Sequence, residues 1–343
     1  MKKPIVAGVA LVLALSACTS SKPTESGGAA APPASVDPSA PPATSVTAPQ
    51  KASKNYNIQF IQGVAGDEFY ITMQCGIEAE AAKLGVTVKT QGAQKFDPTL
   101  QKPILDSVVA AKPDAILIAP TDVKAMQQPL EAAAAAGIKV VLVDTTTEDP
   151  SYAVSAIASD NVGGGKAAFD GIKKLNPNGG KVMTMSVDPG ISTTDQREQG
   201  FKEAAAADSA FKYLGVQYSH NDPATAASLI GSALQKDPDI VGVFAANLFS
   251  AEGTATGARQ AGKSTVKVVG FDAGPNQIKA LREGTVQALV AQQPGIIGQY
   301  GVDMAVAALD GGQVTPKVQT GFTVIDKDNI DGEGGQAAYK SSC

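Results

Sequence analysis

The chain has 343 residues and a formal net charge of −5, with 28 lysines and arginines against 33 aspartates and glutamates. The charge is mild and spread out, with no basic stripe, so we expect no nucleic-acid partner. One histidine and three cysteines are too few for a zinc site, and a catalytic triad could be built only around His220. We therefore expect a protein that is not an enzyme and needs no metal or cofactor.

The N-terminus has the pattern of an export signal. Lys2 and Lys3 precede an apolar run over residues 5–15, which predicts a secretory signal peptide over residues 1–17. The following LSAC, which ends at Cys18, resembles the lipobox of bacterial lipoproteins; the alternative is an ordinary signal peptide with a chance cysteine. We expect Cys18 to be lipidated and to anchor the chain to the cell membrane outside the cytoplasm, in the periplasm or on the outer face.

Residues 18–54 consist of this cysteine and a stretch of mostly Pro, Ala, Ser and Thr. Such a composition cannot bury a core, so we predict a disordered linker. The rest of the chain, residues 55–343, is long enough for two ordinary domains.

From residue 55 onward the sequence alternates short apolar runs with helix-length segments. In the first half we expect strands at residues 57–62, 86–90, 115–119 and 138–143, with helices at 67–84, from 97, and at 123–136. Asp97-Pro98 is a typical helix start, and Gly137 a typical helix end. Regular alternation with near-continuous apolar strands predicts an α/β fold with parallel sheets covered by helices on both faces.

The second half continues the same pattern. We expect helices at residues 162–175, 193–206, 222–235, 276–283 and 295–309, and strands at 181–186, 213–219, 240–245, 266–271, 285–291 and near 322–325. The last helix is long enough to return to the first half. The chain is therefore expected to cross between two lobes more than once.

The two halves repeat one arrangement. Asp97-Pro98 precedes Pro113 by the same interval at which Asp222-Pro223 precedes Pro238, and Asp144 takes the place of Asp272 at the end of an apolar strand. In open parallel sheets, ligands bind at the carboxyl ends of the strands. This pattern predicts two facing copies of one α/β half, with Asp144 and Asp272 toward the ligand.

After lipidation of Cys18, two cysteines remain, Cys75 and Cys343. Outside the cytoplasm a disulfide between them is permitted. Two free thiols are the equally open alternative.

Eight segments, in order and spacing, are similar to a known family: KLGVTV, PTD, AAGIKVVLVD, IASDNVGGG, QREQGF, VFAAN, KVVGFD and VAQQP. They resemble the type I periplasmic sugar-binding proteins, the ribose-binding-protein-like solute receptors of ABC importers. The resemblance implies two Rossmann-like lobes that close over a sugar, with a three-strand hinge near Ser159, Gln292–Gln293 and Gly321. The expected lobes are residues 55–159 plus 293–320, and residues 160–292 plus 321–343.

The resemblance also implies a ligand site. Phe69 and Tyr70 correspond to aromatic residues that pack on the sugar, and Phe249 is a further candidate. Several positions depart from the ribose pattern, including Asp195 in place of an arginine and Asn221 in place of a phenylalanine, which argues for a different sugar or a polyol. The expected ligand-binding residues are Asp67, Phe69, Tyr70, Asp144, Asp195, Arg197, Asn221, Asn247, Asp272 and Gln292.

These residue types suit a polyhydroxylated ligand. Carboxylates accept several hydroxyls, amides both donate and accept, and aromatic faces cover C–H surface. Structural roles are the alternatives: Asp144 and Asp272 as turn residues, Phe69 and Tyr70 as core residues, Asn247 as a helix N-cap, Arg197 as a support for loops and Gln292 as a hinge residue.

We therefore expect a monomeric receptor lipoprotein that captures a small sugar or sugar alcohol and delivers it to an ABC importer permease. One alternative is a receptor for a chemosensory or signalling system with a furanose-like ligand. The other is a carbohydrate-active enzyme.

Overall fold

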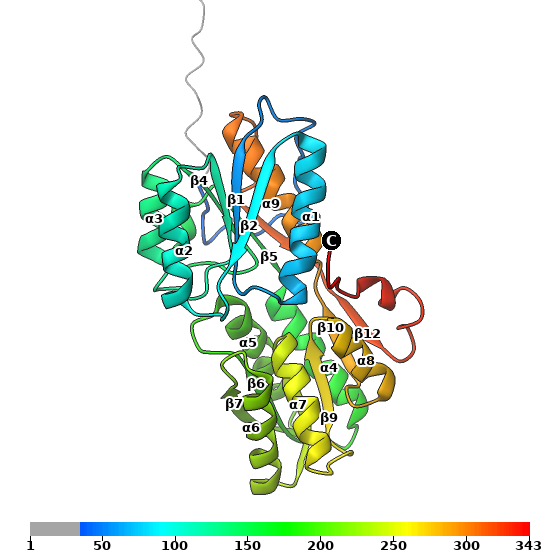
Figure 1. Cartoon of the computed structure of the whole chain (residues 1–343). Coiled ribbons are helices and arrows are strands. Elements are labelled where there is room, and N and C mark those ends of the chain that lie inside the picture. Colours follow the sequence, from blue (N-terminus) through cyan, green and yellow to red (C-terminus); the bar gives the residue numbers. More distant parts are fainter. Residues whose placement is uncertain (1–34) are drawn as a thin grey trace, which may run out of the picture. The chain divides into compact units, whose positions relative to one another are not determined.

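The computed structural model describes residues 35–343, which form the two predicted α/β lobes (Figure 1). The first lobe contains β1 (Asn57–Gln62), β2 (Thr87–Gly92), β3 (Ala115–Ile118), β4 (Lys139–Val143), β5 (Ser155–Ser159) and β11 (Lys317–Thr320). These strands are all parallel, in the order β11-β5-β4-β3-β1-β2.

The second lobe has a sheet of the same size. Its strands are β6 (Gly180–Ser186), β7 (Phe211–Tyr218), β8 (Ile240–Ala245), β9 (Lys267–Phe271), β10 (Ala288–Ala291) and β12 (Thr323–Asp326). The order is β12-β10-β9-β8-β6-β7, with β12 antiparallel to β10 and the other pairs parallel.

Helices cover both faces of each sheet. The helices are α1 (Glu68–Leu84), α2 (Pro98–Ala110), α3 (Gln127–Ala135), α4 (Asn161–Leu175), α5 (Ser192–Ala206), α6 (Pro223–Lys236), α7 (Leu248–Gln260), α8 (Pro275–Glu283) and α9 (Pro294–Leu309), with short 3₁₀ turns η1 (Pro150–Tyr152) and η2 (Gly334–Ala337). In β3, Ile116 and Ile118 pack in the cluster of α2 and α3, whereas Leu117 packs in the cluster of α1 and α9. Alternate residues of one strand thus serve two cores, which explains its continuous apolar run.

The chain passes between the two sheets at three places. Ser159 ends β5 just before α4, Ala291 ends β10 just before α9, and Thr320 ends β11 just before β12. These connections lie side by side, because β5 pairs with β11 and β10 pairs with β12. They form the hinge between the lobes.

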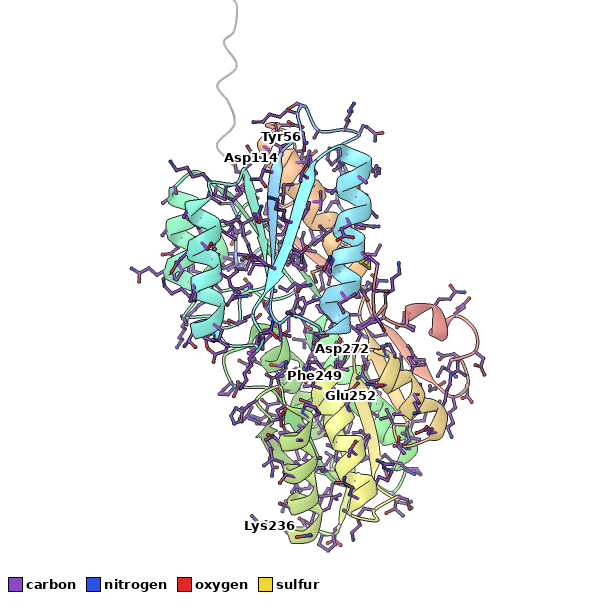
Figure 2. The ribbon with its side chains drawn as sticks, in the orientation of Figure 1. Tyr56, Asp114, Lys236, Phe249, Glu252 and Asp272 are labelled. Atoms are coloured by element: carbon purple, nitrogen blue, oxygen red, sulfur yellow. A yellow bond between two sulfur atoms is a disulfide. The ribbon has the colours of Figure 1, made fainter. Side chains whose placement is uncertain are left out.

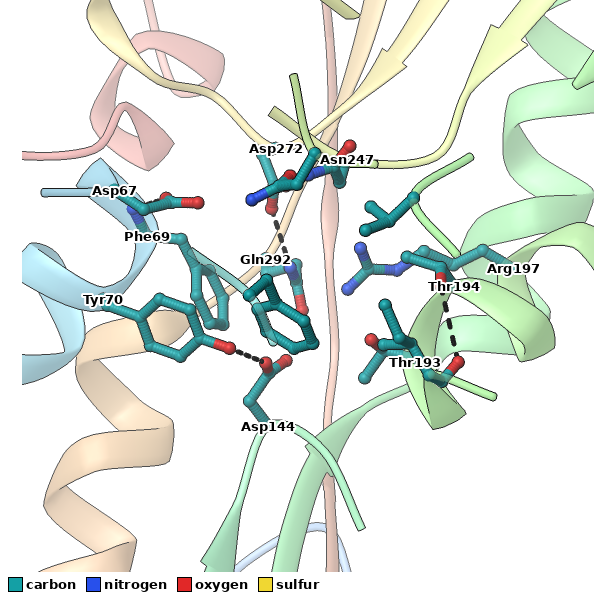
Figure 3. A pocket seen from close by; sticks show the side chains of 14 residues that line it. Asp67, Phe69, Tyr70, Asp144, Thr193, Thr194, Arg197, Asn247, Asp272 and Gln292 are labelled. Atoms are coloured by element: carbon teal, nitrogen blue, oxygen red, sulfur yellow. Dashed lines mark hydrogen bonds between the residues drawn. The ribbon is translucent and has the colours of Figure 1, made fainter. Parts of the chain in front are cut away.

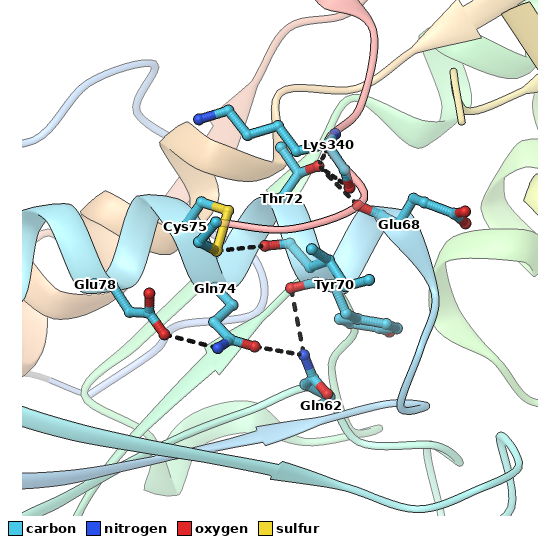
Figure 4. Close-up of a disulfide and its surroundings, with 10 residues drawn as sticks. Gln62, Glu68, Tyr70, Thr72, Gln74, Cys75, Glu78 and Lys340 are labelled. Atoms are coloured by element: carbon cyan, nitrogen blue, oxygen red, sulfur yellow. Dashed lines mark hydrogen bonds between the residues drawn. A yellow bond between two sulfur atoms is a disulfide. The ribbon is translucent and has the colours of Figure 1, made fainter. Parts of the chain in front are cut away.

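A fourth connection between the lobes is a disulfide bond and not a crossing of the main chain. Cys75 on α1 and Cys343 at the C-terminus form a disulfide, which decides between the two alternatives left open by the sequence (Figure 4). We expected residues 321–343 to belong wholly to the second lobe. After η2, however, the chain returns to α1 of the first lobe, because the disulfide and a hydrogen bond from Lys340 N to Thr72 Oγ1 hold it there.

Residues 35–54 also differ from expectation, because they pack on the first lobe and are not a free spacer. Val36 is 2% exposed and its N–H donates to Ala153 O, Ala43 forms a parallel bridge to Val318, and Ala52 N donates to Leu84 O. The segment needs no core of its own, since its extended backbone pairs with the open edge of β11.

The signal peptide expected over residues 1–17 and the lipidation site at Cys18 lie outside the described residues. Within residues 35–343, no helix is both long and apolar enough to span a bilayer.

Candidate functional site

A cavity lies between the lobes, at the carboxyl ends of the strands (Figure 3). Figure 2 shows Asp272 and Phe249 at the end of the second lobe that faces the first, and Lys236 at its opposite end. The cavity is lined by Asp67, Phe69, Tyr70, Phe96, Asp144, Val187, Ile191, Thr193, Thr194, Arg197, Asn221, Asn247, Asp272 and Gln292.

Asp144 and Asp272 are equivalent residues of the two lobes. Each directly follows a strand, β4 or β9, and each has a left-handed backbone, with φ of 67° and 77°. Aspartate is among the few non-glycine residues that adopt this conformation readily. The turn ends each strand at the cavity and presents its carboxylate there (Figure 3).

The two carboxylates have different hydrogen-bond partners. Asp144 Oδ2 accepts from the Tyr70 hydroxyl at 2.7 Å. Asp272 Oδ1 accepts from Gln292 Nε2 at 2.7 Å and from the Tyr339 hydroxyl at 3.0 Å, and its Oδ2 accepts from Leu248 N at 3.0 Å. Asp272 is therefore fixed on both oxygens, whereas Asp144 has more acceptor capacity left for a ligand.

Arg197 on α5 supplies the positive charge of the cavity. Its Nε donates to Asn161 Oδ1 at 2.9 Å, its Nη1 donates to Ala246 O at 2.9 Å, and its guanidinium lies 3.8 Å from the centre of the Phe271 ring. The side chain is 3% exposed, so these contacts hold it rigidly. Two bonds use only part of its five N–H groups, and the guanidinium faces the cavity (Figure 3). Arg197 therefore both supports loops and lines the site.

Burial controls the electrostatics of the site. It raises the pKa of Asp144 to about 6, although Arg197 and the Tyr70 hydrogen bond oppose this. Burial also raises the pKa of Asp272, again against Arg197, and raises that of Asp67 well above its ordinary range, with Asp272 adding to the effect. Ligand hydroxyls that donate to these buried carboxylates would favour their charged form.

The aromatic wall comes from the first turn of α1. Asp67 caps this helix, accepting from Phe69 N at 2.8 Å, and so places Phe69 and Tyr70 at the cavity. Their rings meet edge to face with centroids 5.1 Å apart. Phe96, in the loop after β2, adds a third ring. Phe249, the further aromatic candidate, is not among the lining residues and packs against the core instead.

The structure gathers nine of the ten predicted site residues around the cavity and excludes Asp195. Asp195 Oδ2 instead accepts from Gly190 N at 2.9 Å, near the start of α5. Successive helical residues are turned by about 100°, so Asp195 and Arg197 point to nearly opposite sides of α5. The arginine of this helix faces the cavity, and the aspartate stabilises the turn before it.

Asn221 and Asn247 are joined by a side-chain hydrogen bond. Asn247 Nδ2 donates to Asn221 Oδ1 at 2.6 Å, and Asn247 Oδ1 accepts from Ser250 N as the N-cap of α7. Asn247 thus has the structural role considered as an alternative and also lines the cavity.

Five lining residues were missed: Phe96, Val187, Ile191, Thr193 and Thr194. Val187 directly follows β6, so the strand-end rule that pointed to Asn247 and Asp272 would have found it. The threonines begin α5 just before Arg197, and only their polar character marks them.

The lobes also touch beside the cavity. Val123 N donates to Gly190 O at 3.0 Å, and Thr146 N donates to Ser192 Oγ at 3.0 Å. In both pairs, the donor belongs to the first lobe and the acceptor to the second. The structure is therefore a closed arrangement of the lobes.

The polar groups of the cleft do not form a hydrolytic triad. His220 Nδ1 is 2.6 Å from Asp188 Oδ1, and its side chain is 70% exposed, outside the set of lining residues. Within residues 35–343, no cluster of three or more His, Cys, Asp or Glu side chains has the arrangement of a metal site.

Comparison with known proteins agrees with this geometry. Residues 58–313 match the periplasmic binding protein domain. The ribose import binding protein RbsB of Escherichia coli (strain K12) is 32% identical over 285 residues, 83% of this chain and 95% of that protein.

Two solved structures extend the comparison. A solute-binding protein of an ABC transporter from Agrobacterium vitis, bound with α-D-tagatopyranose, is 45% identical with a TM-score of 0.82, covering 83% of this chain and 100% of that one. A carbohydrate transporter solute-binding protein from Agrobacterium radiobacter, in complex with D-arabinose, is 29% identical with a TM-score of 0.79, covering 84% and 100%. These relatives are transport proteins and not enzymes. The chain belongs to the periplasmic binding protein family, in its type I sugar-binding branch.

Proposed function

We propose that this protein captures a small neutral sugar or sugar alcohol between its lobes. The observation that carries the proposal is the cleft in which two equivalent carboxylates, Asp144 and Asp272, line one cavity together with Arg197. A monosaccharide has the hydroxyls to meet these groups and the C–H faces to pack on the aromatic wall.

Ligand binding favours the closed form, because the first lobe supplies one part of the lining and the second lobe supplies the rest. The groups of the first lobe are Asp67, Phe69, Tyr70, Phe96 and Asp144. An open form makes only part of these contacts. The contacts that the ligand makes only in the closed form supply the free energy that drives closure.

A six-membered ketose ring is our first candidate for the ligand. The most similar of the structures compared above holds α-D-tagatopyranose at 45% identity. A pyranose presents hydroxyls around its whole rim, which suits acceptors on opposite sides of the cleft. D-Arabinose, bound by the second structure, is the next candidate.

We propose further that the protein is a monomeric lipoprotein, anchored through Cys18 outside the cytoplasm, which delivers its sugar to an ABC importer permease. The LSAC motif supports the anchor, and the description of the Escherichia coli relative as an import binding protein supports the delivery. Palmitate labelling of the expressed chain should depend on Cys18. A Cys18→Ser variant that still incorporates label would contradict the anchor.

The test of sugar capture is titration calorimetry of the full-length protein in detergent with D-tagatose, D-arabinose, D-ribose, D-allose and their alcohols. We expect one-to-one binding of at least one of these, with the sugar recovered unchanged by chromatography. No binding across the set by well-folded protein would contradict the proposal, and conversion of the sugar would show an enzyme instead.

A further inference from the structure

Tyr339 lies behind the site, although it comes from the last few residues of the chain. Its hydroxyl accepts from Gln292 N at 2.9 Å and is 3.0 Å from Asp272 Oδ1, which can only accept. Because the backbone N–H occupies a lone pair of the oxygen, the hydroxyl proton is directed to Asp272. The side chain is 6% exposed, and its ring lies 6.0 Å from that of Phe69.

The C-terminal tail, residues 338–343, is held at three points. Tyr339 N donates to Ala273 O at 2.9 Å, Lys340 N donates to Thr72 Oγ1 at 2.8 Å, and Cys343 is bonded to Cys75 (Figure 4). The first contact is to the second lobe, next to Asp272. The other two are to α1, the helix that begins with the aromatic wall.

We propose that Tyr339 is a positioning residue for the ligand site, which orients Asp272 toward the sugar, and that the Cys75–Cys343 disulfide keeps Tyr339 in place. This rests on the proposed function, in which Asp272 accepts a sugar hydroxyl. Tyr339 itself does not line the cavity, so it acts through Asp272.

The equivalent aspartate of the first lobe is held in the same way. Asp144 accepts from the Tyr70 hydroxyl at 2.7 Å, as Asp272 accepts from Tyr339. Tyr70 belongs to a helix that is part of the lobe, whereas Tyr339 belongs to a tail that needs an anchor. The disulfide supplies that anchor, which gives a chemical reason for joining residues 268 positions apart.

Loss of the Tyr339 hydroxyl should also alter the acid–base behaviour of the site. The charged and titratable groups that face Asp272 are Asp67 at the N-cap of α1, Arg197 on α5 and Tyr339, with Asp144 across the cavity. Donation from Tyr339 favours the charged carboxylate and so lowers the pKa of Asp272. Without it this pKa rises, and acid should abolish sugar binding at a higher pH.

The main test compares the full-length protein with Tyr339→Phe, which keeps the ring and removes the hydroxyl. We expect about tenfold weaker binding of D-tagatose by calorimetry, the usual loss for a hydrogen bond to a charged group, with the acid limb of the pH profile shifted upward. Tyr300→Phe on α9, outside the set of lining residues, is the matched control and should behave as wild type. Equal affinity and an equal pH profile for Tyr339→Phe would overturn the proposal.

A measurement without sugar separates this proposal from the proposed function. Carbon NMR of labelled aspartates, with the Asp272 signal assigned through Asp272→Asn, gives the pKa of Asp272 in the unliganded protein. Tyr339→Phe should raise it, and an unchanged value would overturn the positioning role. Failure of the wild type to bind any sugar would contradict the proposed function alone.

The role of the disulfide is tested with Cys343→Ser and Cys75→Ser. Both should weaken sugar binding in the same direction as Tyr339→Phe, and adding Tyr339→Phe to either should cost less than it does in the wild type, because the changes act through one contact. Wild-type affinity in the serine variants, or fully additive losses, would show that the tail holds Tyr339 without the disulfide.

Discussion

The Asp144 carboxylate has one fixed hydrogen-bond partner, the Tyr70 hydroxyl, and its two functions can be separated. Asp144→Asn keeps an oxygen that accepts from the Tyr70 hydroxyl but removes the negative charge that would accept sugar hydroxyls. We expect sugar affinity to fall about tenfold or more, by the usual cost of losing a charged hydrogen-bond acceptor. Calorimetry measures this directly, with Asp195→Asn as the matched control that should leave affinity unchanged.

The same variant tests the effect of burial on stability. The pKa of Asp144 is about 6 in the folded protein against an ordinary value of 3.8. The folded state therefore binds the proton more tightly, so this group contributes stability that is lost as pH rises from about 4 through about 6. In the unliganded Asp144→Asn variant, the free energy of unfolding should not show this fall with rising pH. The variant should be at least as stable as wild type near pH 8, as measured by urea unfolding. Lower stability of the variant at this pH would contradict the prediction.

At the scale of elements, the position of Arg197 depends on how closely α4 and α5 approach. A Cβ added at Gly165 on α4 would overlap the carbonyl oxygen of Arg197. Gly165→Ala should push α5 outward, destabilise the fold by about 2 kcal/mol as overpacking does, and weaken sugar binding. Urea unfolding and calorimetry measure the two effects.

Gly231→Ala on α6 is the control for that change. Nothing lies within 4 Å of a Cβ at this helical glycine. The extra methyl group should therefore stabilise the protein by about 0.5–1 kcal/mol through the helix preference of alanine, with sugar affinity unchanged. Equal behaviour of the two alanine variants would contradict the role of the close approach.

The contact between α1 and α9 should make stability depend on pH. Asp303 on α9 is 3% exposed, and burial together with neighbouring Glu80 raises its pKa to about 7, against a smaller opposing effect of Lys83. A folded pKa above the unfolded one means that stability falls as pH rises from about 4 through about 7. Asp303→Asn should be more stable than wild type by at least about 1 kcal/mol near pH 8, with the difference shrinking as pH falls and disappearing only below about pH 4. A pH-independent difference in urea unfolding would contradict this.

The elements that the sequence predicts well are those with a continuous apolar run, such as β3, where both faces are buried. The strands that it missed, β5 and β11, lie toward the open edge of the first sheet. β11 reads KVQT, with two polar or charged side chains only partly buried, so it has no apolar run to detect. On the side away from β5, it is bridged by Ala43 of residues 35–54, whose composition predicted a disordered linker.

In the candidate site, too, the residues that the sequence predicts well are those next to a continuous apolar run. Asp144, Asn247 and Asp272 were predictable because each ends an apolar strand at the edge where the two lobes meet. Phe96 lies in a loop and Tyr339 in the tail, and neither position has a local pattern. The positions of these two side chains depend on contacts between residues far apart in the sequence. A local pattern of apolar residues carries no information about such contacts.

For the whole molecule, residues 35–54 are part of the folded first lobe. A chain that begins at residue 55 would lose the buried Val36 side chain and the backbone bonds at Ala43 and Ala52. We expect such a chain to be less stable than one that begins at residue 35 by about 2 kcal/mol, the usual gain from burying a valine. Equal urea midpoints for the two chains would show that the segment contributes nothing.

The charged lining of the cleft consists of three carboxylates, Asp67, Asp144 and Asp272, and one cation, Arg197. Arg197 already interacts with both strand-end aspartates, where it opposes the rise in pKa that burial causes. It therefore has little positive potential left for a third anion. A uronic acid or a sugar phosphate would bring a further negative charge among buried side chains, where repulsion is poorly screened. We therefore expect the protein to reject acidic sugars by their charge even when their ring fits, and to bind the neutral sugars of a mixture that contains both.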